Sequence, residues 1–449
     1  MIGGKRPNIV VLVGFDTGRQ FRPYGITTVN TPNAERLAGE GVVFENAFCA
    51  SPLGSGSCAA LFSGRPPHAV GVLGPTGAWA GFRFSSEATH AADLFKAIGY
   101  ETMLLGEALE SAGPGSPDAK DGGFGFDARG PAGRPLLAKD LQTEMPAILD
   151  ARQDSRKPFY LQIAMRETRA TRPDEAGTGP ESGVTAPETG EAAADLTSAV
   201  NRLDEGLGHV LNLLDQRGLT DDTVLVFTSD RGAPTDRDRM TLYDPDIGVL
   251  LIMRYPGRFA PSLRSQALVS HVDVLPTLLE TAGAPSEAFD GRSILPLLTG
   301  QRGAERECVF AELTFHTAFE PKRCVRTKRC KYIFNFAGTG SYFDELYDLE
   351  NDPGETRNLS RSFSDLYDAM GRPFGTKDLT GYPGDLSAEC LHGGAEDPEM
   401  EAMRHELAAT LAQWMSETGD PILEGPVASP RFYAKLAWLK EQKDRGLHA

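Results

Sequence analysis

The sequence predicts an α/β fold, in which a large, mostly parallel sheet flanked by helices is joined to a smaller antiparallel sheet domain. Up to about residue 304, continuous apolar runs alternate with helical patterns, which is typical of a parallel sheet. Beyond that point, short strand patterns follow one another with no long helix between them. The chain of 449 residues is also long enough for two to three domains. We therefore expect an α/β domain at residues 1–304 and a C-terminal α+β subdomain at residues 305–449.

The first domain opens with the apolar run 8–13, which is typical of a parallel strand buried on both faces. A helix is expected to begin at Pro32, with Thr31 as its N-cap and Gly41 after its end. The later elements are expected as strand 42–47, helix 89–98, strand 101–105, strand 158–164, helix 195–217, strand 222–228 and strand 249–253. In such sheets the loops at the carboxyl ends of strands carry the chemistry, so Asp16, Arg166 and Asp230 are placed for function.

The second domain is predicted from four short strand patterns at 309–312, 324–327, 332–335 and 345–348. A closing helix is expected at 405–416, around Trp414. Two segments rich in Pro, Gly and polar residues, 114–133 and 172–191, have little to bury and are predicted to be loops.

Composition excludes several classes of protein. Lys and Arg number 45 against 62 Asp and Glu, and the net charge of −17 disfavours binding to nucleic acid or to an anionic membrane surface. Six cysteines without a C-x-x-C pair indicate neither a disulfide scaffold nor a structural zinc site. No run reaches the ~18 apolar residues of a membrane span, and the first strand is too short for a secretory signal. We therefore expect a cytoplasmic protein.

Several short motifs follow one another in a fixed order along the chain. They are RPNI at 6–9, TPN at 31–33, AALFSGRPPH at 59–68, FTSD at 227–230, TLYDP at 241–245, DVLPTL at 273–278 and DPGET at 352–356. Taken together, this series resembles the sulfatase family of the alkaline phosphatase superfamily. The segments at 16–19, 312–316 and 414–421 are similar to the sulfamidase (heparan N-sulfatase) subgroup, which implies a homodimer.

The resemblance implies hydrolysis of sulfate esters or sulfamates. Family members use a Cys or Ser matured to formylglycine, a calcium ion, and a ring of Lys, His and Arg around the sulfuryl group. This sequence departs from the nucleophile motif Cys-x-Pro-Ser-Arg, because the matching window 54–58 reads GSGSC. Gly54 stands at the nucleophile position, Gly56 and Cys58 replace the Pro and the Arg, and Ser57 is kept. Glycine has no side chain to mature, so formylglycine chemistry is excluded at this position.

The charged ring and the metal site also depart from the family pattern. Glu107 and Leu109 stand where the family has a Lys and a His, and the ring positions downstream are arginines: Arg169, Arg231 and Arg239. The resemblance leaves Asp16 and Asp230 as former metal ligands, with Thr17 as a weak third. Calcium needs about six to eight oxygen ligands. Because Arg231 would place a positive charge beside the ion, we expect no metal and no cofactor.

Three functions remain open. The first is a repurposed anion pocket that binds a sulfo- or phospho-bearing small molecule or glycan, for transfer or elimination without hydrolysis; guanidinium groups suit such anions. Its binding residues would be Arg169, Arg231, Arg239, Arg19, Arg166, Ser57 and His316. Alternatively, these arginines form an internal ion network with Asp16, Glu107, Glu167 and Asp230.

The second function is that of a non-catalytic pseudoenzyme, which serves a protein partner as a scaffold or subunit. The third is a divergent hydrolase with a displaced nucleophile, for which the candidates are Ser55, Ser57, Thr17 and Cys58. A serine in a Gly/Ser turn is more often a capping residue. The resemblance leaves no histidine base near this window.

Overall fold

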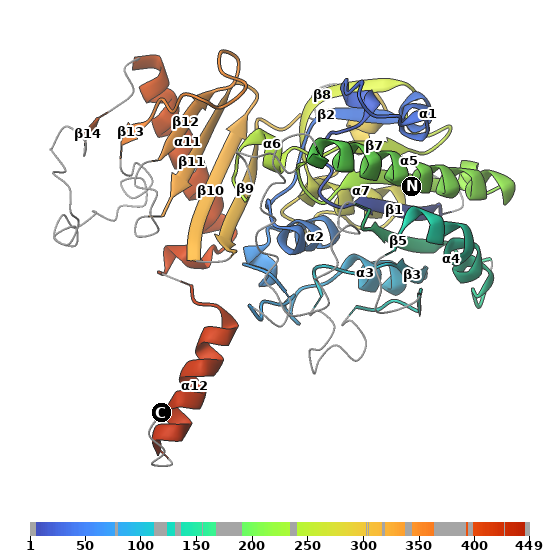
Figure 1. Ribbon diagram of the computed structural model, residues 1–449, viewed down its shortest axis with the longest axis horizontal. Helices are drawn as coiled ribbons and strands as arrows, with labels where there is room; N and C mark the ends of the chain where they lie inside the picture. The colour runs from blue at the N-terminus through green and yellow to red at the C-terminus, as the bar shows by residue number, and fades with distance from the viewer. Residues whose placement is uncertain are drawn as a thin grey trace.

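The computed structural model describes most of the chain and contains two main sheets (Figure 1). The described residues are 6–76, 80–111, 124–130, 136–154, 156–167, 191–233, 240–301, 303, 305–316, 319–336, 344–362, 392–393, 398–425 and 427–444. Of the two predicted loops, 114–123, 131–133 and 172–190 lie outside these residues.

The large sheet has eight strands in the order β4-β3-β5-β1-β6-β7-β2-β8. Their bounds are β1 Asn8–Gly14, β2 Val42–Phe48, β3 Glu101–Leu105, β4 Ala128–Arg129, β5 Phe159–Met165, β6 Thr223–Ser229, β7 Leu251–Arg254 and β8 Leu263–Ser270. Neighbouring strands are parallel except at β7, which runs antiparallel to both β6 and β2. The predicted fold class is confirmed. β4 and β8 were not expected, and the first half of β8 lacks a continuous apolar run.

Helices cover both faces of this sheet, which gives three layers. Ile9, Val11 and Val13 of β1 face a core shared with α2 (Gly54–Ser63), α3 (Ala91–Ala97) and α7 (Val274–Thr281). The alternate residues Val10 and Leu12 face a second core, shared with α1 (Pro32–Glu40), α4 (Ala138–Asp150) and α5 (Glu191–Gln216). A strand buried on both faces reads as a continuous apolar run, which explains why β1 was predictable.

The start of α1 differs in detail from the expectation. Thr31 precedes the helix, but its hydroxyl makes no cap hydrogen bond and instead accepts from the Arg22 N–H (3.0 Å). The buried Asp204 of α5 takes the capping role, since its carboxylate accepts from the N–H groups of Asn33 (3.1 Å) and Ala34 (2.8 Å). Burial raises the pKa of Asp204, and these hydrogen bonds oppose that shift.

The second sheet is antiparallel, with the order β12-β11-β10-β9. Its strands are β9 Cys308–Phe315, β10 Phe319–Thr327, β11 Cys330–Asn335 and β12 Glu345–Asp348. Helix α11 (Pro398–Glu417) packs on it around a core that includes Tyr332 and Leu411. A further helix that was not expected, α12 (Pro430–Asp444), extends away from the body (Figure 1). The boundary at residues 304 and 305 stays a prediction.

The remaining short elements connect these layers. They are η1 Arg22–Tyr24, η2 His68–Val70, η3 Thr220–Asp222, α6 Asp244–Ile247, η4 His271–Asp273, α8 Leu295–Leu298, η5 Pro421–Leu423 and the strand pair β13 (Arg361–Ser362) and β14 (His392–Gly393). Within the described parts of the chain, no helix is both long and apolar enough to cross a membrane.

Buried ion pairs join the two sheets. The Nζ of Lys331, on β11, lies 2.7 Å from Asp244 Oδ1 on α6 and 2.6 Å from Glu355 Oε1. It also donates to the Leu242 carbonyl oxygen (2.9 Å). Burial alone would raise the pKa of the Asp244 carboxyl, but Lys331 and Arg326 outweigh it and hold that pKa below its usual value.

Candidate functional site

Two carboxylates meet at the carboxyl edge of the large sheet. Asp16 follows β1 and Asp230 follows β6, and these two strands are hydrogen-bonded neighbours. The Asp16 N–H donates to Asp230 Oδ1 (2.7 Å), so the structure brings the two residues together as expected. Asp16 has a φ of 56°, in the left-handed region that aspartate tolerates better than most residues.

The side chain of Arg231 lies against this pair. Its Nε donates to Asp16 Oδ1 (2.6 Å), and its backbone N–H donates to Asp230 Oδ1 (2.8 Å). Its Nη1 lies 3.4 Å from Asp246 Oδ1 on α6. Arg231 is only 6% exposed, and Asp246 is fully buried. The guanidinium therefore serves as a buried counter-charge between carboxylates from two loops.

Sequence reasoning missed Asp246. The available signal was a carboxylate just after the TLYDP motif, next to a run of apolar residues. Its other oxygen accepts from the Thr241 N–H (2.8 Å), which holds the loop before α6. A Cβ on Gly232 would lie 1.9 Å from the Pro245 carbonyl oxygen, so only glycine lets the loop carrying Arg231 approach α6 this closely.

The donor set does not fit the calcium ion that the family resemblance implies. A calcium site needs oxygen ligands around the ion, whereas a guanidinium already bonds to Asp16 at the place where the ion's ligands would gather. In the described part of the chain, no group of three or more His, Cys, Asp and Glu side chains is arranged to hold a metal. Thr17 is fully buried, and its hydroxyl has no hydrogen-bond partner among the described residues.

The N-terminus of α2 lies beside the carboxylates. Gly54 is the first residue of this helix, and Leu53 before it provides no side-chain cap. The Ser57 hydroxyl, in the first turn, donates to the Asp230 carbonyl oxygen, which fixes the helix next to the cluster. First-turn N–H groups have no partner within a helix and favour an anion. The glycine at the former nucleophile position thus begins a helix that points its positive end at this edge.

Ser57 also contacts a histidine that the sequence did not single out. Ser57 Oγ lies 3.1 Å from His271 Nδ1, and His271 Nε2 lies 3.1 Å from Thr228 Oγ1. Burial lowers the pKa of His271 to about 3, so the imidazole is neutral near pH 7. A total of 214 residues separate Ser57 from His271, so only the fold reveals the contact. Ser57 and His271 are both buried, so this hydroxyl does not face solvent.

The other candidate nucleophiles and His316 lie around the same helix. The buried Ser55 hydroxyl lies 3.4 Å from the Gly74 carbonyl oxygen, and Cys58 is part of the apolar core. His316 follows β9, whose last residue, Phe315, donates its N–H to the Leu73 carbonyl oxygen (3.0 Å). The loop at residues 73–74 therefore joins the first turn of α2 to the end of β9 that precedes His316.

The arginines do not form one ring in the described residues. Arg166 Nη1 pairs with Glu107 Oε2 (3.0 Å), and Arg231 pairs with Asp16, so the predicted ion network is present for these two. Glu167, which was also expected in that network, pairs with Arg202 (2.9 Å).

Arg19 is also placed differently from the expectation. Its guanidinium donates to the carbonyl oxygens of Ala47 (2.6 Å) and Val249 (3.3 Å), and it lies over the Phe48 ring. Arg19 therefore links β2 to the segment just before β7, and its guanidinium is not part of the acidic cluster. Arg169 and Arg239 lie outside the described residues.

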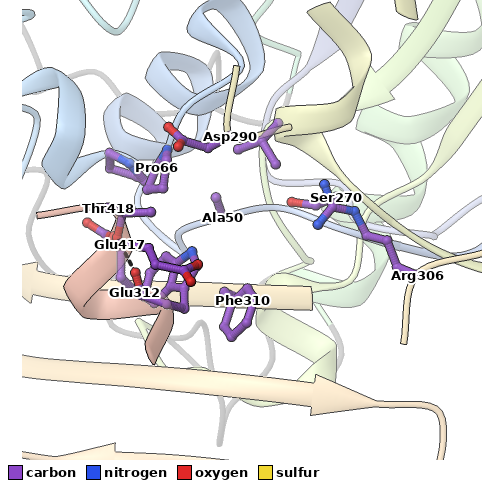
Figure 2. Close-up of a pocket in the computed structure, with 12 residues that line it drawn as sticks. Ala50, Pro66, Ser270, Asp290, Arg306, Phe310, Glu312, Glu417 and Thr418 are labelled. Carbon is purple, nitrogen blue, oxygen red and sulfur yellow. Dashed lines mark hydrogen bonds between the residues drawn. The ribbon is translucent and has the colours of Figure 1, made fainter. Parts of the chain in front are cut away.

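A cavity of about 250 Å³ lies between the two sheets and does not include this cluster. Figure 2 shows Ala50, Pro66, Phe310 and Thr418 around it. Arg306 lines it with its guanidinium bonded to Asp273, while Asp290, Glu312 and Glu417 add negative charge. Two of these carboxylates are paired, Glu312 with His68 and Asp290 with Arg65 (3.8 Å).

Comparison with known proteins fits the fold. Residues 7–284 match the family model described as Sulfatase. The chain belongs to the sulfatase family. Residues 236–370 match the model described as N-sulphoglucosamine sulphohydrolase, C-terminal, which confirms the sulfamidase-like character of this sulfatase.

Similar proteins cover almost the whole chain. An ulvan-active sulfatase of Formosa agariphila is 25% identical over 95% of this chain and 83% of its own. Human N-sulphoglucosamine sulphohydrolase is 26% identical over 93% of this chain and 92% of its own. The crystal structure of the phosphonate monoester hydrolase of Agrobacterium radiobacter has a TM-score of 0.68 at 19% identity, over 94% of this chain and 99% of that one, and shows the same fold.

Proposed function

We propose that this sulfatase-family protein binds a sulfo- or phospho-bearing small molecule or glycan without formylglycine and without calcium. The observation that carries the proposal is the guanidinium of Arg231 bonded to Asp16, beside a helix that begins with glycine at the nucleophile position. The relatives named for sulfated substrates support the ligand class. With a bound acceptor, such a site suits transfer or elimination of the group.

The proposed anion contacts are backbone donors at this edge and two arginines that the family resemblance assigns. The first-turn N–H groups of α2 supply backbone donors. Arg169 and Arg239 match family positions that face the sulfate, and they supply the charge. Arg166 and Arg231 are paired internally, so they act as positioning residues that balance the carboxylates.

Hydrolysis is the alternative that the named relatives favour. It would need a displaced nucleophile, and the Ser57–His271 pair is the arrangement that comes nearest to one. Two facts oppose it. Ser57 is completely buried, and its hydroxyl also donates to the Asp230 carbonyl oxygen. A nucleophile must be within reach of the sulfur atom.

The first experiment tests turnover. The chain is co-expressed with a formylglycine-generating enzyme and assayed with 4-nitrophenyl sulfate and with glucosamine N-sulfate. We expect no hydrolysis, because Gly54 has no side chain to mature. Turnover that is lost in Ser57→Ala or Ser55→Ala would establish the displaced-nucleophile hydrolase instead. Turnover that survives both substitutions would show that the nucleophile window is assigned wrongly.

The second experiment tests anion binding by calorimetry with inorganic sulfate and phosphate. Arg169→Ala and Arg239→Ala should each weaken binding by about 1.5–3 kcal/mol, the range of a hydrogen bond to a charged group. The control is Arg156→Ala, because Arg156 is an exposed arginine in a loop, where it pairs with Asp154 (3.0 Å). Unchanged affinity in both test variants would reject the anion site.

A further inference from the structure

Helix α12 carries an exposed apolar surface that its own chain does not cover. Phe432, Tyr433, Leu436 and Trp438 are 52%, 57%, 47% and 53% exposed, and they are the large apolar side chains found exposed in the described residues. The helix extends away from both sheets (Figure 1). An isolated helix of about 15 residues is only marginally stable in water. A helix of this kind that bears three exposed aromatic rings indicates a binding surface.

The distribution of these side chains around the helix indicates what covers it. Phe432 and Leu436 lie one turn apart on the same side. Trp438 follows Leu436 by two residues, and at about 100° per residue it projects from nearly the opposite side. A helix that lies on a membrane surface needs a single apolar stripe with a polar face opposite it. Apolar groups on opposite sides fit a protein groove instead.

Charge complementarity points to a second copy of this chain. Four basic and two acidic side chains give α12 a net charge of +2, which leaves −19 for the rest of a chain whose total is −17. The helix is therefore attracted to the acidic body of a second copy, while the two bodies repel each other. We propose that α12 is an exchanged arm, which docks on the body of a second copy and holds a two-fold symmetric dimer together.

The area that two arms cover is sufficient for such a dimer. An aromatic side chain buries about 150–250 Å². Covering the exposed halves of three aromatic rings and Leu436 therefore removes roughly 350 Å² from each arm. The body that receives the arm loses a similar area, so two arms bury roughly 1,400 Å², within the ~1,200–2,000 Å² of stable interfaces.

The base of the arm is anchored near the candidate site. A Cβ on Gly81 would lie 3.5 Å from Pro430 Cβ and 3.6 Å from the Arg431 nitrogen. The next residue, Phe82, packs its ring 5.7 Å from that of Phe315, which precedes His316. An exchanged arm would therefore leave the body beside the end of β9. The inference does not depend on the proposed function.

Sedimentation velocity tests the exchanged arm on the full chain. The unmodified protein should sediment as a dimer, at twice 48.4 kDa. The double variant Phe432→Ser with Trp438→Ser should weaken dimerisation at least about 100-fold, because two aromatic anchors are lost from each arm. Its circular dichroism and melting midpoint as a monomer should stay those of a folded protein, since Phe432 and Trp438 are 52% and 53% exposed and lie on a helix that extends away from both sheets (Figure 1).

A charge-reversal pair tests the acidic body as the partner. Arg431→Glu with Lys435→Glu should weaken the dimer, and added salt should reduce the difference from the unmodified chain. The matched control is Arg156→Glu with Lys157→Glu, which makes the same charge change in an exposed loop before β5. A monomeric unmodified chain, or a dimer that persists in the serine variant, would overturn the proposal. Binding of a monomer to phosphatidylserine vesicles would overturn it in favour of a membrane.

Discussion

Single side chains determine which ions the carboxyl edge of the large sheet can hold. Asp16 and Asp230 follow two strands and Asp246 lies on α6, and all three carboxylates are buried. Carboxylates that lie so near one another cannot all stay ionised without a counter-charge. Arg231 supplies that charge through bonds to Asp16 and Asp246. Arginine stays protonated under all ordinary conditions, so Arg231 gives this cluster one permanent positive charge.

The buried His271 leads to a prediction about how stability depends on pH. Its pKa falls from 6.5 to about 3 on folding because of burial. Below pH 6.5 the unfolded chain takes up a proton at this residue and the folded chain does not, so stability is lost as the pH falls. The loss should be about 1.4 kcal/mol per pH unit.

The measurement is urea denaturation of the unmodified chain and of His271→Asn between pH 7 and pH 5. The free energy of unfolding should fall less steeply with decreasing pH in the variant, by about 1.4 kcal/mol per unit below pH 6.5. The exposed His405 on α11 provides the matched control, because His405→Asn makes the same substitution outside the buried core. Parallel slopes in all three proteins would contradict a neutral buried His271.

At the scale of elements, buried ion pairs rather than apolar contact alone join the two sheets. Lys331 on β11 is fully buried between Asp244 and Glu355. Within the second domain, Arg323 on β10 is also fully buried, and its Nη2 donates to Asp420 Oδ1 (2.9 Å), which holds the segment after α11 against the second sheet. Removing one partner from such a pair leaves a charge without compensation, which is costly.

Lys331→Met should therefore lower the free energy of unfolding by about 3–5 kcal/mol, because the buried Glu355 loses its cation while Asp244 keeps only Arg326. The matched control is Lys328→Met on the loop before β11, where the pair with Glu305 is half exposed. It should cost no more than about 1 kcal/mol. Urea denaturation followed by tryptophan fluorescence measures both values. Equal losses in the two variants would contradict a structural role for the buried cluster.

The elements that the sequence predicted share one physical property. β1, β3, β5 and β6 are buried on both faces, so each leaves a continuous apolar run. β8 was missed because its first four residues alternate between partly buried and exposed side chains. α12 was missed because its apolar residues do not follow one helical stripe, which is the pattern that identifies a surface helix.

Site residues could be predicted from the sequence where they directly follow a strand. They could not be predicted where the contact joins residues that are far apart in the sequence. Asp16, Asp230 and Arg231 follow β1 and β6 directly, so the sheet topology brings them together. Asp246 lies on α6 and His271 on η4. Only tertiary packing places Asp246 against Arg231 and His271 against Ser57. The family pattern marks which positions carry chemistry but does not reveal these new contacts.

At the scale of the whole molecule, the chain keeps the fold of the sulfatase family. Residues 7–284 match the family model, and the eight-stranded sheet is present with helices on both faces. At the carboxyl edge of this sheet, Gly54 begins α2 and the Arg231 guanidinium bonds to Asp16. These two observations are the basis of the proposal that the chain binds the anion without hydrolysing it.

Thermal melting of the whole protein with added calcium and with a chelator tests the replacement of the metal most directly. The midpoint of the unmodified chain should be the same in both, because Arg231 already compensates Asp16 and Asp246. Arg231→Asn removes the guanidinium and should make the midpoint rise with calcium. At a calcium concentration a hundredfold above the dissociation constant, binding should add about 2.7 kcal/mol to the free energy of unfolding. An unmodified chain that gains several degrees with calcium and loses them with the chelator would contradict the metal-free site and favour a hydrolase.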